Sequence, residues 1–208
     1  MSMTIGTYAA SLIAQYQQTG HAQVDPNLPT EHKLAIAQEV LKHSQYGQSV
    51  LDWLNTHGRA IAVTPEAQWP GQFQAFWGVT ANSQTWIRES VLNDPVAAAM
   101  LIAHETTHAF DQSGENAKLP TVAQFDQKRH AAWTEVNAFT AEATTAQQLG
   151  IPLQYAGTSL PPNDRPLQDK AVDRATGTIR DRQQTLAAIL ADPRYDGETE
   201  GVQPYEQL

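Results

Sequence analysis

The sequence predicts an α+β fold in which a small, aromatic-rich β-sheet packs on one buried helix, with further helices before and after it. Three observations support this fold class. Segments with apolar residues at helical spacing occupy both ends of the chain. Short alternating segments rich in aromatic residues, typical of strands, lie between residues 59 and 89. A mostly apolar helical segment, residues 94–111, follows them directly.

Length and composition indicate one globular domain. The chain has 208 residues, of which 41% are hydrophobic and 17% charged, and this is enough for one sizeable core. We expect a single domain over residues 1–192, made of a helical part (1–58), a sheet with central helices (59–150) and a C-terminal helix (167–192). The acidic residues 193–208 are expected to form a flexible tail.

Charge and the N-terminus restrict the partners and the location. The net charge of −9 argues against nucleic acid and anionic membranes as partners, because both attract basic surfaces. The N-terminus has neither the basic segment nor the continuous apolar segment of a signal peptide, which predicts a cytoplasmic location. The chain contains no cysteine, so any metal ion must be held by His, Asp or Glu.

The first 58 residues are expected to be helical scaffold. An apolar stripe predicts a helix over residues 4–18. A second helix is expected over residues 30–56, because Gly58 is a favourable residue just beyond a helix C-terminus. The histidines of this part have no ligand-like spacing, and we expect none of them to bind metal: His21, His32, His43 and His57.

The middle of the chain is expected to form a small sheet. Residues 59–63, 72–79 and 84–89 are the strand candidates, and Asn82 and Ser83 suit a hairpin turn between the last two. Aromatic side chains are concentrated in this part, at Trp69, Phe73, Phe76, Trp77 and Trp86. They predict packing between the sheet and the following helix, with the alternative that some of them wall a substrate cleft.

The helix expected over residues 94–111 should be buried. Asn93 or Asp94 can cap its first turn, and Pro95 suits the first helical position, where no amide donor is needed. Few polar residues precede the two histidines near its end. Because buried imidazoles and carboxylates are costly unless they are paired, the polar residues of this helix are candidates for a functional site.

These polar residues follow the pattern His-Glu-x-x-His. His104 and His108 are four residues apart, so they project from one face of the helix and can share a zinc ion. Glu105 lies beside them and can accept a proton from a water molecule that the metal activates. A catalytic zinc ion takes three protein ligands, so a third must come from elsewhere.

The third ligand is expected on the next helix, which the apolar pattern predicts over residues 121–149, closed by Gly150. Its candidate ligands are Asp126, His130, Glu135 and Glu142. Residues 151–166 are Pro-rich and predict an irregular segment, and a last helix is expected over residues 167–190.

The motif His104-Glu-Thr-Thr-His108, followed by Glu135-Val-Asn-Ala-Phe, resembles the gluzincin branch of zinc metallopeptidases. It is most similar to the minimal gluzincins and to the relatives of phage-repressor-cleaving proteases. The resemblance covers residues 84–145 and implies a zincin-like fold. It also implies that His104, His108 and Glu135 are the zinc ligands and that Glu105 is the catalytic base. Glu142 is the chief alternative for the third ligand.

The sequence departs from related patterns at several positions. The extended metzincin motif needs Gly at position 111 and His at position 114, where this chain has Asp111 and Gly114. Thermolysin-like relatives carry Asp four residues after the ligand Glu, where this chain has Phe139. Asp111, one turn beyond the second histidine, is placed to orient a ligand histidine instead. Tyr155 and His130 are candidate donors to the oxyanion of the reaction.

The function implied by the resemblance is zinc-dependent hydrolysis of peptide bonds, with a peptide or protein as the substrate. Glu105 would accept a proton from the attacking water and pass it to the leaving amine. An extended substrate is expected to pair with the strand around residues 85–89. One alternative is a zinc-binding or regulatory protein without peptidase activity. Another is a di-iron helical bundle, which would need a second Glu-x-x-His motif that the sequence lacks.

Overall fold

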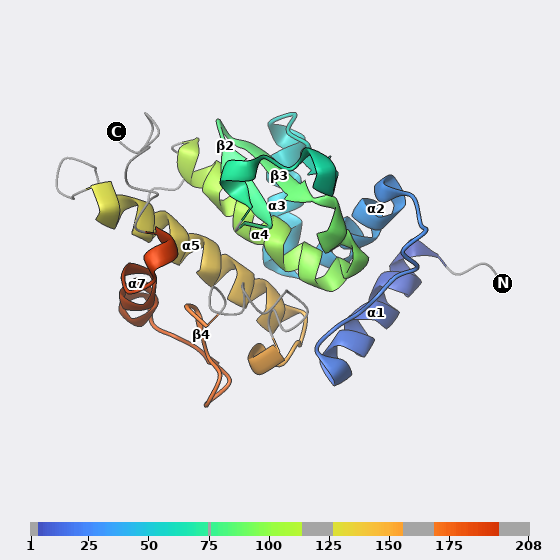
Figure 1. Ribbon diagram of the computed structural model, residues 1–208. Coiled ribbons are helices and arrows are strands. Elements are labelled where there is room, and N and C mark those ends of the chain that lie inside the picture. The colour runs from blue at the N-terminus through green and yellow to red at the C-terminus, as the bar shows by residue number, and fades with distance from the viewer. Residues whose placement is uncertain (1–3, 75, 114–126, 156–168, 196–208) are drawn as a thin grey trace.

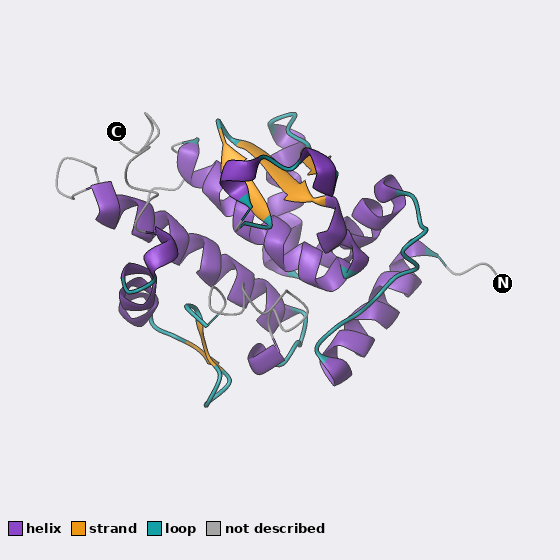
Figure 2. Cartoon of the chain, in the orientation of Figure 1, coloured by secondary structure: helices purple, strands orange, loops and turns teal. Residues whose placement is uncertain are grey.

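In the computed structural model, helix α4 (Pro95–Gln112) lies at the centre of a mixed α+β chain (Figure 1). The structure describes residues 4–74, 76–113, 127–155 and 169–195. On one side α4 contacts the N-terminal helices α1 (Ile5–Thr19), α2 (Thr30–Leu41) and α3 (Gln45–Thr56). A three-stranded sheet covers another side of α4, and α5 (Gln127–Gln148) lies along a third (Figure 2). The prediction of an α+β fold around one buried helix is confirmed.

The N-terminal part contains two helices where the sequence predicted a single one over residues 30–56. The backbone of Ser44 is extended, and its hydroxyl accepts a hydrogen bond from the amide of Gly47 at 2.9 Å, which caps α3. A Cβ atom on Gly47 would lie 2.4 Å from the carbonyl oxygen of Leu41, so only glycine allows the two helices to meet this closely. The helix predicted over residues 4–18 is confirmed as α1.

The sheet contains β1 (Ile61–Thr64), β2 (Gly78–Ala81) and β3 (Gln84–Arg88) in the order β1-β3-β2. β1 is parallel to β3, and β2 is antiparallel to it, so β3 is the central strand. Asn82 and Ser83 have φ angles of 50° and 56° and form the predicted hairpin turn. The strand predicted over residues 72–79 begins only at Gly78, because residues 71–73 form a short 3₁₀ turn.

Among the described residues near the sheet, the aromatic side chains form no cluster with one another, although Trp77 packs against the hydrophobic core and Trp69 is buried. Thr85, Ile87 and Arg88 are the buried residues of β3, whereas Trp86 is only partly buried. Alternation along the strand therefore turns the tryptophan away from the core. Trp69 and Trp77 instead hold the guanidinium of Arg88 at 5.2 Å and 5.3 Å from their ring centroids.

Helix α4 begins where the sequence predicted. The Asp94 carboxylate accepts hydrogen bonds from the amides of Val96 and Ala97 at 3.2 Å and 3.0 Å. Its other oxygen accepts from the amide of Ala22 at 2.9 Å, which ties the start of the helix to the connector before α2. Most of α4 is buried, as its apolar sequence implies. None of the described helices combines the length and the hydrophobicity that a bilayer-spanning segment requires.

The C-terminal part corrects the prediction of one helix over residues 167–190. β4 (Val172–Asp173) and β5 (Thr178–Ile179) form a small hairpin, and the helix α7 (Arg182–Leu190) follows. Asp173 accepts a hydrogen bond from the amide of Ala175, and Gly177 takes a φ of 66°, so both act as turn residues. α7 packs against α5 (Figure 1).

The first residues of the expected tail are part of the fold. Residues 193–195 form the 3₁₀ turn η6 (Pro193–Tyr195), and Tyr195 is only 7% exposed. Of the segment predicted to be irregular, the described residues include the turn η5 (Leu153–Tyr155). Residues 156–168 and 196–208 lie outside the described part of the chain.

Candidate metal centre

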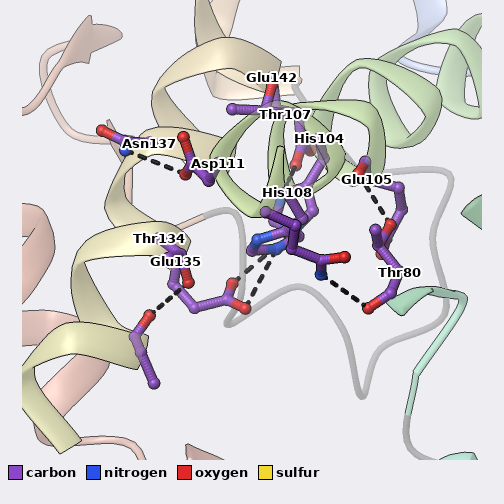
Figure 3. A network of polar contacts seen from close by, with 12 residues as sticks. Thr80, His104, Glu105, Thr107, His108, Asp111, Thr134, Glu135, Asn137 and Glu142 are labelled. Carbon is purple, nitrogen blue, oxygen red and sulfur yellow. Dashed lines mark hydrogen bonds and ion pairs between the residues drawn. The ribbon is translucent and has the colours of Figure 1, made fainter. Parts of the chain in front are cut away.

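Three side chains from two helices converge at one point between α4 and α5 (Figure 3). Nε2 of His108 lies 3.2 Å from Oε1 of Glu135, and Nε2 of His104 lies 3.6 Å from Oε2 of the same carboxylate. One donor atom from each of the three residues lies within 4.8 Å of the other two. Helical spacing places both imidazoles on one face of α4, and the packing of α5 along that face delivers the carboxylate.

These residues fit a bound transition metal. Zinc–ligand bonds of about 2.0–2.2 Å at tetrahedral angles put donor atoms roughly 3.4 Å apart, close to the observed 3.2 Å and 3.6 Å. Two imidazoles and one carboxylate suit zinc, and they also suit iron and other divalent transition metals. The group could therefore hold a metal ion, and its geometry leaves the identity of the metal open.

The charges of the group favour a protonated His108 when no metal is bound. Burial by itself lowers the pKa of His108, but the facing carboxylate of Glu135, with smaller contributions from Glu105 and Asp111, raises it to about 10. Burial would raise the pKa of Glu135, but the ion pair with His108 and further contacts lower it. A metal ion entering the site must therefore displace a proton from His108.

Glu105 lies on the side of the group that faces the sheet (Figure 3). Burial raises its pKa, and the nearby imidazoles of His104 and His108 oppose that shift. The hydroxyl of Thr80 in β2 lies 2.9 Å from Oε2 of Glu105 and 2.8 Å from its carbonyl oxygen, so its one proton is shared between them. A carboxylate with a raised pKa, adjacent to a candidate metal site, is suited to accept and return protons.

Gly78 makes room for this carboxylate. A Cβ atom at position 78 would lie 2.6 Å from both Cγ and Oε1 of Glu105, which is closer than real contacts allow. The backbone of β2 can therefore approach Glu105 only because residue 78 has no side chain. With Thr80 two residues further on, β2 confines the carboxylate from one side.

Glu142, the rival candidate for the third ligand, contacts the other nitrogen of the first histidine. Its Oε2 lies 3.3 Å from Nδ1 of His104, whereas Glu135 faces the Nε2 atoms. This is an ion-pair distance, although Nδ1 has no aligned hydrogen bond in the described part of the chain. The arrangement matches a carboxylate that orients a metal-binding imidazole from behind. The structure thus separates the two glutamates, with Glu135 in the candidate ligand group and Glu142 outside it.

Asp111 belongs to a buried polar network behind the group. Its Oδ2 accepts a hydrogen bond from Nδ2 of Asn137 at 3.1 Å, and Oδ1 of Asn137 accepts one from Arg182 at 2.6 Å. The guanidinium of Arg182 stacks over Trp133 at 5.3 Å. Asp111 also contributes to the raised pKa of His108. The predicted place of Asp111 near a ligand histidine is therefore compatible with the structure, and the network ties it to α7.

The structure does not bring Tyr155 to the metal-ligating group. Tyr155 lies in η5, beyond the C-terminal end of α5, and its carbonyl oxygen accepts a hydrogen bond from the hydroxyl of Tyr16 in α1. Glu135 lies 13 residues before the end of α5 at Gln148, about 20 Å along the helix axis. The side chain of His130 and the whole of Asp126 lie outside the described residues.

The tyrosine that does reach the group was missed from the sequence. The side chain of Tyr195 adds to the effects of His108 and His104 in lowering the pKa of Glu135, and its contribution is the smallest. Tyr195 stands 60 residues after Glu135 in a segment with the composition of an acidic tail, which hid its role. The signal that the sequence offered for this contact was an aromatic residue shortly after the last helix.

Fold and site together define a mixed α+β chain with a His-His-Glu group able to hold a metal ion. No family model, no curated protein and no solved structure matches the chain, so its function has to be inferred from the chemistry of this group.

Proposed function

We propose that the protein is a zinc-dependent metallopeptidase of the gluzincin type. The observation that carries the proposal is the placement of Glu135 at 3.2 Å and 3.6 Å from the two imidazoles of His-Glu-x-x-His, with Glu105 beside them. His104, His108 and Glu135 would hold the zinc ion. When bound, zinc supplies a Lewis acid that polarises the scissile carbonyl group and lowers the pKa of water.

Glu105 has the environment of a general base. Its buried carboxylate has a raised pKa, and the Thr80 hydroxyl contacts Oε2, which leaves Oε1 to accept a proton from the attacking water. The same oxygen then donates that proton to the leaving amine as the C–N bond breaks, so the carboxylate ends the reaction in its starting state. Burial of Glu105 keeps its proton away from bulk water between the two steps.

The substrate-pairing strand is β2 rather than β3 in this proposal. β3 has a partner strand on each side, so it cannot accept a third one, and the pairing expected at residues 85–89 is wrong. Arg88 donates its backbone amide to the carbonyl of Trp77, so by alternation Gly78 and Thr80 direct their backbone groups away from β3. The Thr80 carbonyl already accepts a hydrogen bond from Gln112 at 3.2 Å. Gly78, next to Glu105, is therefore the main backbone position for an extended peptide.

A second candidate function is metal binding without hydrolysis. His104 and Glu105 are only 7% and 5% exposed, and closed sites of this kind are typical of structural metals. The two candidates differ in one outcome, which is whether the metal-loaded protein cleaves peptide bonds.

The test is the variant Glu105→Gln beside the control Glu31→Gln, which makes the same change on an exposed face of α2. Zinc content and cleavage of an unfolded protein substrate are measured for both variants and the wild type. We expect Glu105→Gln to retain zinc and to lose cleavage, because only the proton acceptor is removed. Cleavage at the wild-type rate in Glu105→Gln would refute this mechanism, and a zinc-loaded wild type without cleavage would favour the second candidate.

A further inference from the structure

A buried side-chain amide joins the two helices of the metal-ligating group, close to the group itself (Figure 3). Asn137 lies in α5, two residues after Glu135, and its Nδ2 donates to Oδ2 of Asp111 in α4 at 3.1 Å. Asp111 lies about one helical turn beyond His108. Asn137 and Asp111 are each only 6% exposed. This hydrogen bond therefore directly links the helix that carries the two imidazoles to the helix that carries the carboxylate.

The oxygen of the same amide is engaged from α7. Arg182, the first residue of α7, donates to Oδ1 of Asn137 at 2.6 Å, and its guanidinium lies 5.3 Å from the ring centroid of Trp133. Trp133 and Asn137 are four residues apart, so Arg182 spans the turn of α5 on which Glu135 lies. Because a guanidinium only donates and a carboxylate only accepts, the amide between them has one favourable orientation.

This link restricts how α5 can move along α4. Its hydrogen bond of 3.1 Å is already near the upper end of the usual range of roughly 2.7–3.2 Å, so it tolerates little displacement. A metal site is at least as strict, because its ligand distances must stay within about 0.2 Å of their ideal values. Sliding α5 by one residue would move Glu135 by about 1.5 Å, which exceeds both limits. The amide and the metal site therefore require the same register of the two helices.

We infer that Asn137 is a positioning residue of the metal centre, which holds α5 on α4 in the register that brings the Glu135 carboxylate to the two imidazoles. The inference rests on the metal centre of the proposed function, but it does not require peptidase activity. An amide with a purely structural role would add only to the stability of the fold. A positioning amide also adds to the affinity for metal, so a metal titration of the folded protein separates the two roles.

The experiment compares the wild type with Asn137→Ala, with Arg182→Ala and with the control Asn55→Ala, which makes the same change at an exposed position of α3. A fourth protein carries the exchange Asp111→Asn/Asn137→Asp. In the exchange, the amide at position 111 can donate to the carboxylate at position 137, which still accepts from Arg182. Both hydrogen bonds and the total charge are therefore kept.

Each metal-free protein is checked for its fold by circular dichroism and for its stability by urea unfolding. It is then titrated with zinc against a chelator of known affinity. Each protein is also loaded with Co²⁺, whose visible spectrum reports the arrangement of its ligands. None of these measurements depends on enzymatic activity.

We expect Asn137→Ala to bind zinc about tenfold more weakly than the wild type and to change the Co²⁺ spectrum, because groups that orient metal ligands are typically worth about 10- to 100-fold in affinity. Arg182→Ala should weaken zinc binding in the same direction, since it frees the amide on one side. The exchange should regain most of the affinity, and Asn55→Ala should match the wild type.

A folded Asn137→Ala protein that loses stability but keeps the zinc affinity and the Co²⁺ spectrum of the wild type would overturn the inference. If Asn137→Ala does not fold, wild-type affinity in Arg182→Ala would overturn it instead. A wild type that binds zinc and cleaves no peptide would refute only the proposed peptidase activity. A wild type that binds no zinc would refute the metal centre together with this inference.

Discussion

Replacing Glu142 by Gln should weaken metal binding without removing a ligand. Glu142 Oε2 lies 3.3 Å from Nδ1 of His104, and both side chains are less than one-tenth exposed. Glutamine keeps the size of the side chain and loses its charge, so the His104 ring loses the carboxylate that orients it. Carboxylates in this position are typically worth about 10- to 100-fold in metal affinity, or roughly 1.4–2.7 kcal/mol.

The assay is a zinc titration against a chelating indicator at neutral pH. It compares wild type, Glu142→Gln and the exposed control Glu31→Gln, with the stoichiometry measured at saturating zinc. We expect one zinc ion per chain in all three proteins and a weaker affinity in Glu142→Gln only. Wild-type affinity in Glu142→Gln would refute the orienting role of this carboxylate. Loss of the site at saturating zinc would instead make Glu142 a ligand.

Three further predictions follow from the charges and the packing of the site. Because the pKa of His108 is raised to about 10 in the metal-free protein, zinc binding at pH 7 should release a proton. Calorimetry in two buffers of different ionisation enthalpy measures this proton release. Identical heats of binding in the two buffers would contradict the raised pKa of His108. The same raised pKa stabilises the metal-free fold fully below pH 6.5, and this stabilisation is lost as the pH rises toward about 10, which urea unfolding should detect. Gly78→Ala should retain zinc and lose most cleavage, because the new Cβ atom would lie 2.6 Å from Oε1 of Glu105. Gly71→Ala is the matched control, since a Cβ atom at position 71 meets nothing within 4 Å. Equal activity of Gly78→Ala and Gly71→Ala would show that Glu105 is not confined by β2.

The central helix could be predicted because its determinants are local. Asp94 and Pro95 mark its start, and the four-residue spacing of His104 and His108 fixes their common face in any α-helix. Local turn signals also define the hairpin at Asn82 and Ser83. The break at Ser44 and the turn at Asp173–Gly177 carry similar signals, but the surrounding helix-forming residues outweighed them in the prediction.

The choice between Glu135 and Glu142 could not be made from the sequence. Residues seven apart lie on the same face of a helix, so periodicity makes both point toward α4. The packing of α5 on α4 decides which carboxylate faces the Nε2 atoms and which faces Nδ1 of His104. The contact of Tyr195 depends on the path of α7 across α5, which no local pattern encodes. The central position of β3 likewise follows from its parallel pairing with β1.

The most direct test of the account is the metal content of the wild type beside Glu135→Ala and Glu142→Ala. The three proteins are equilibrated with saturating zinc, freed of excess metal and analysed by elemental mass spectrometry. The structure places Glu135 at 3.2 Å and 3.6 Å from the two imidazoles, so we expect one zinc ion per chain in the wild type and in Glu142→Ala and none in Glu135→Ala. Zinc retained in Glu135→Ala, or absent from the wild type, would contradict the central claim.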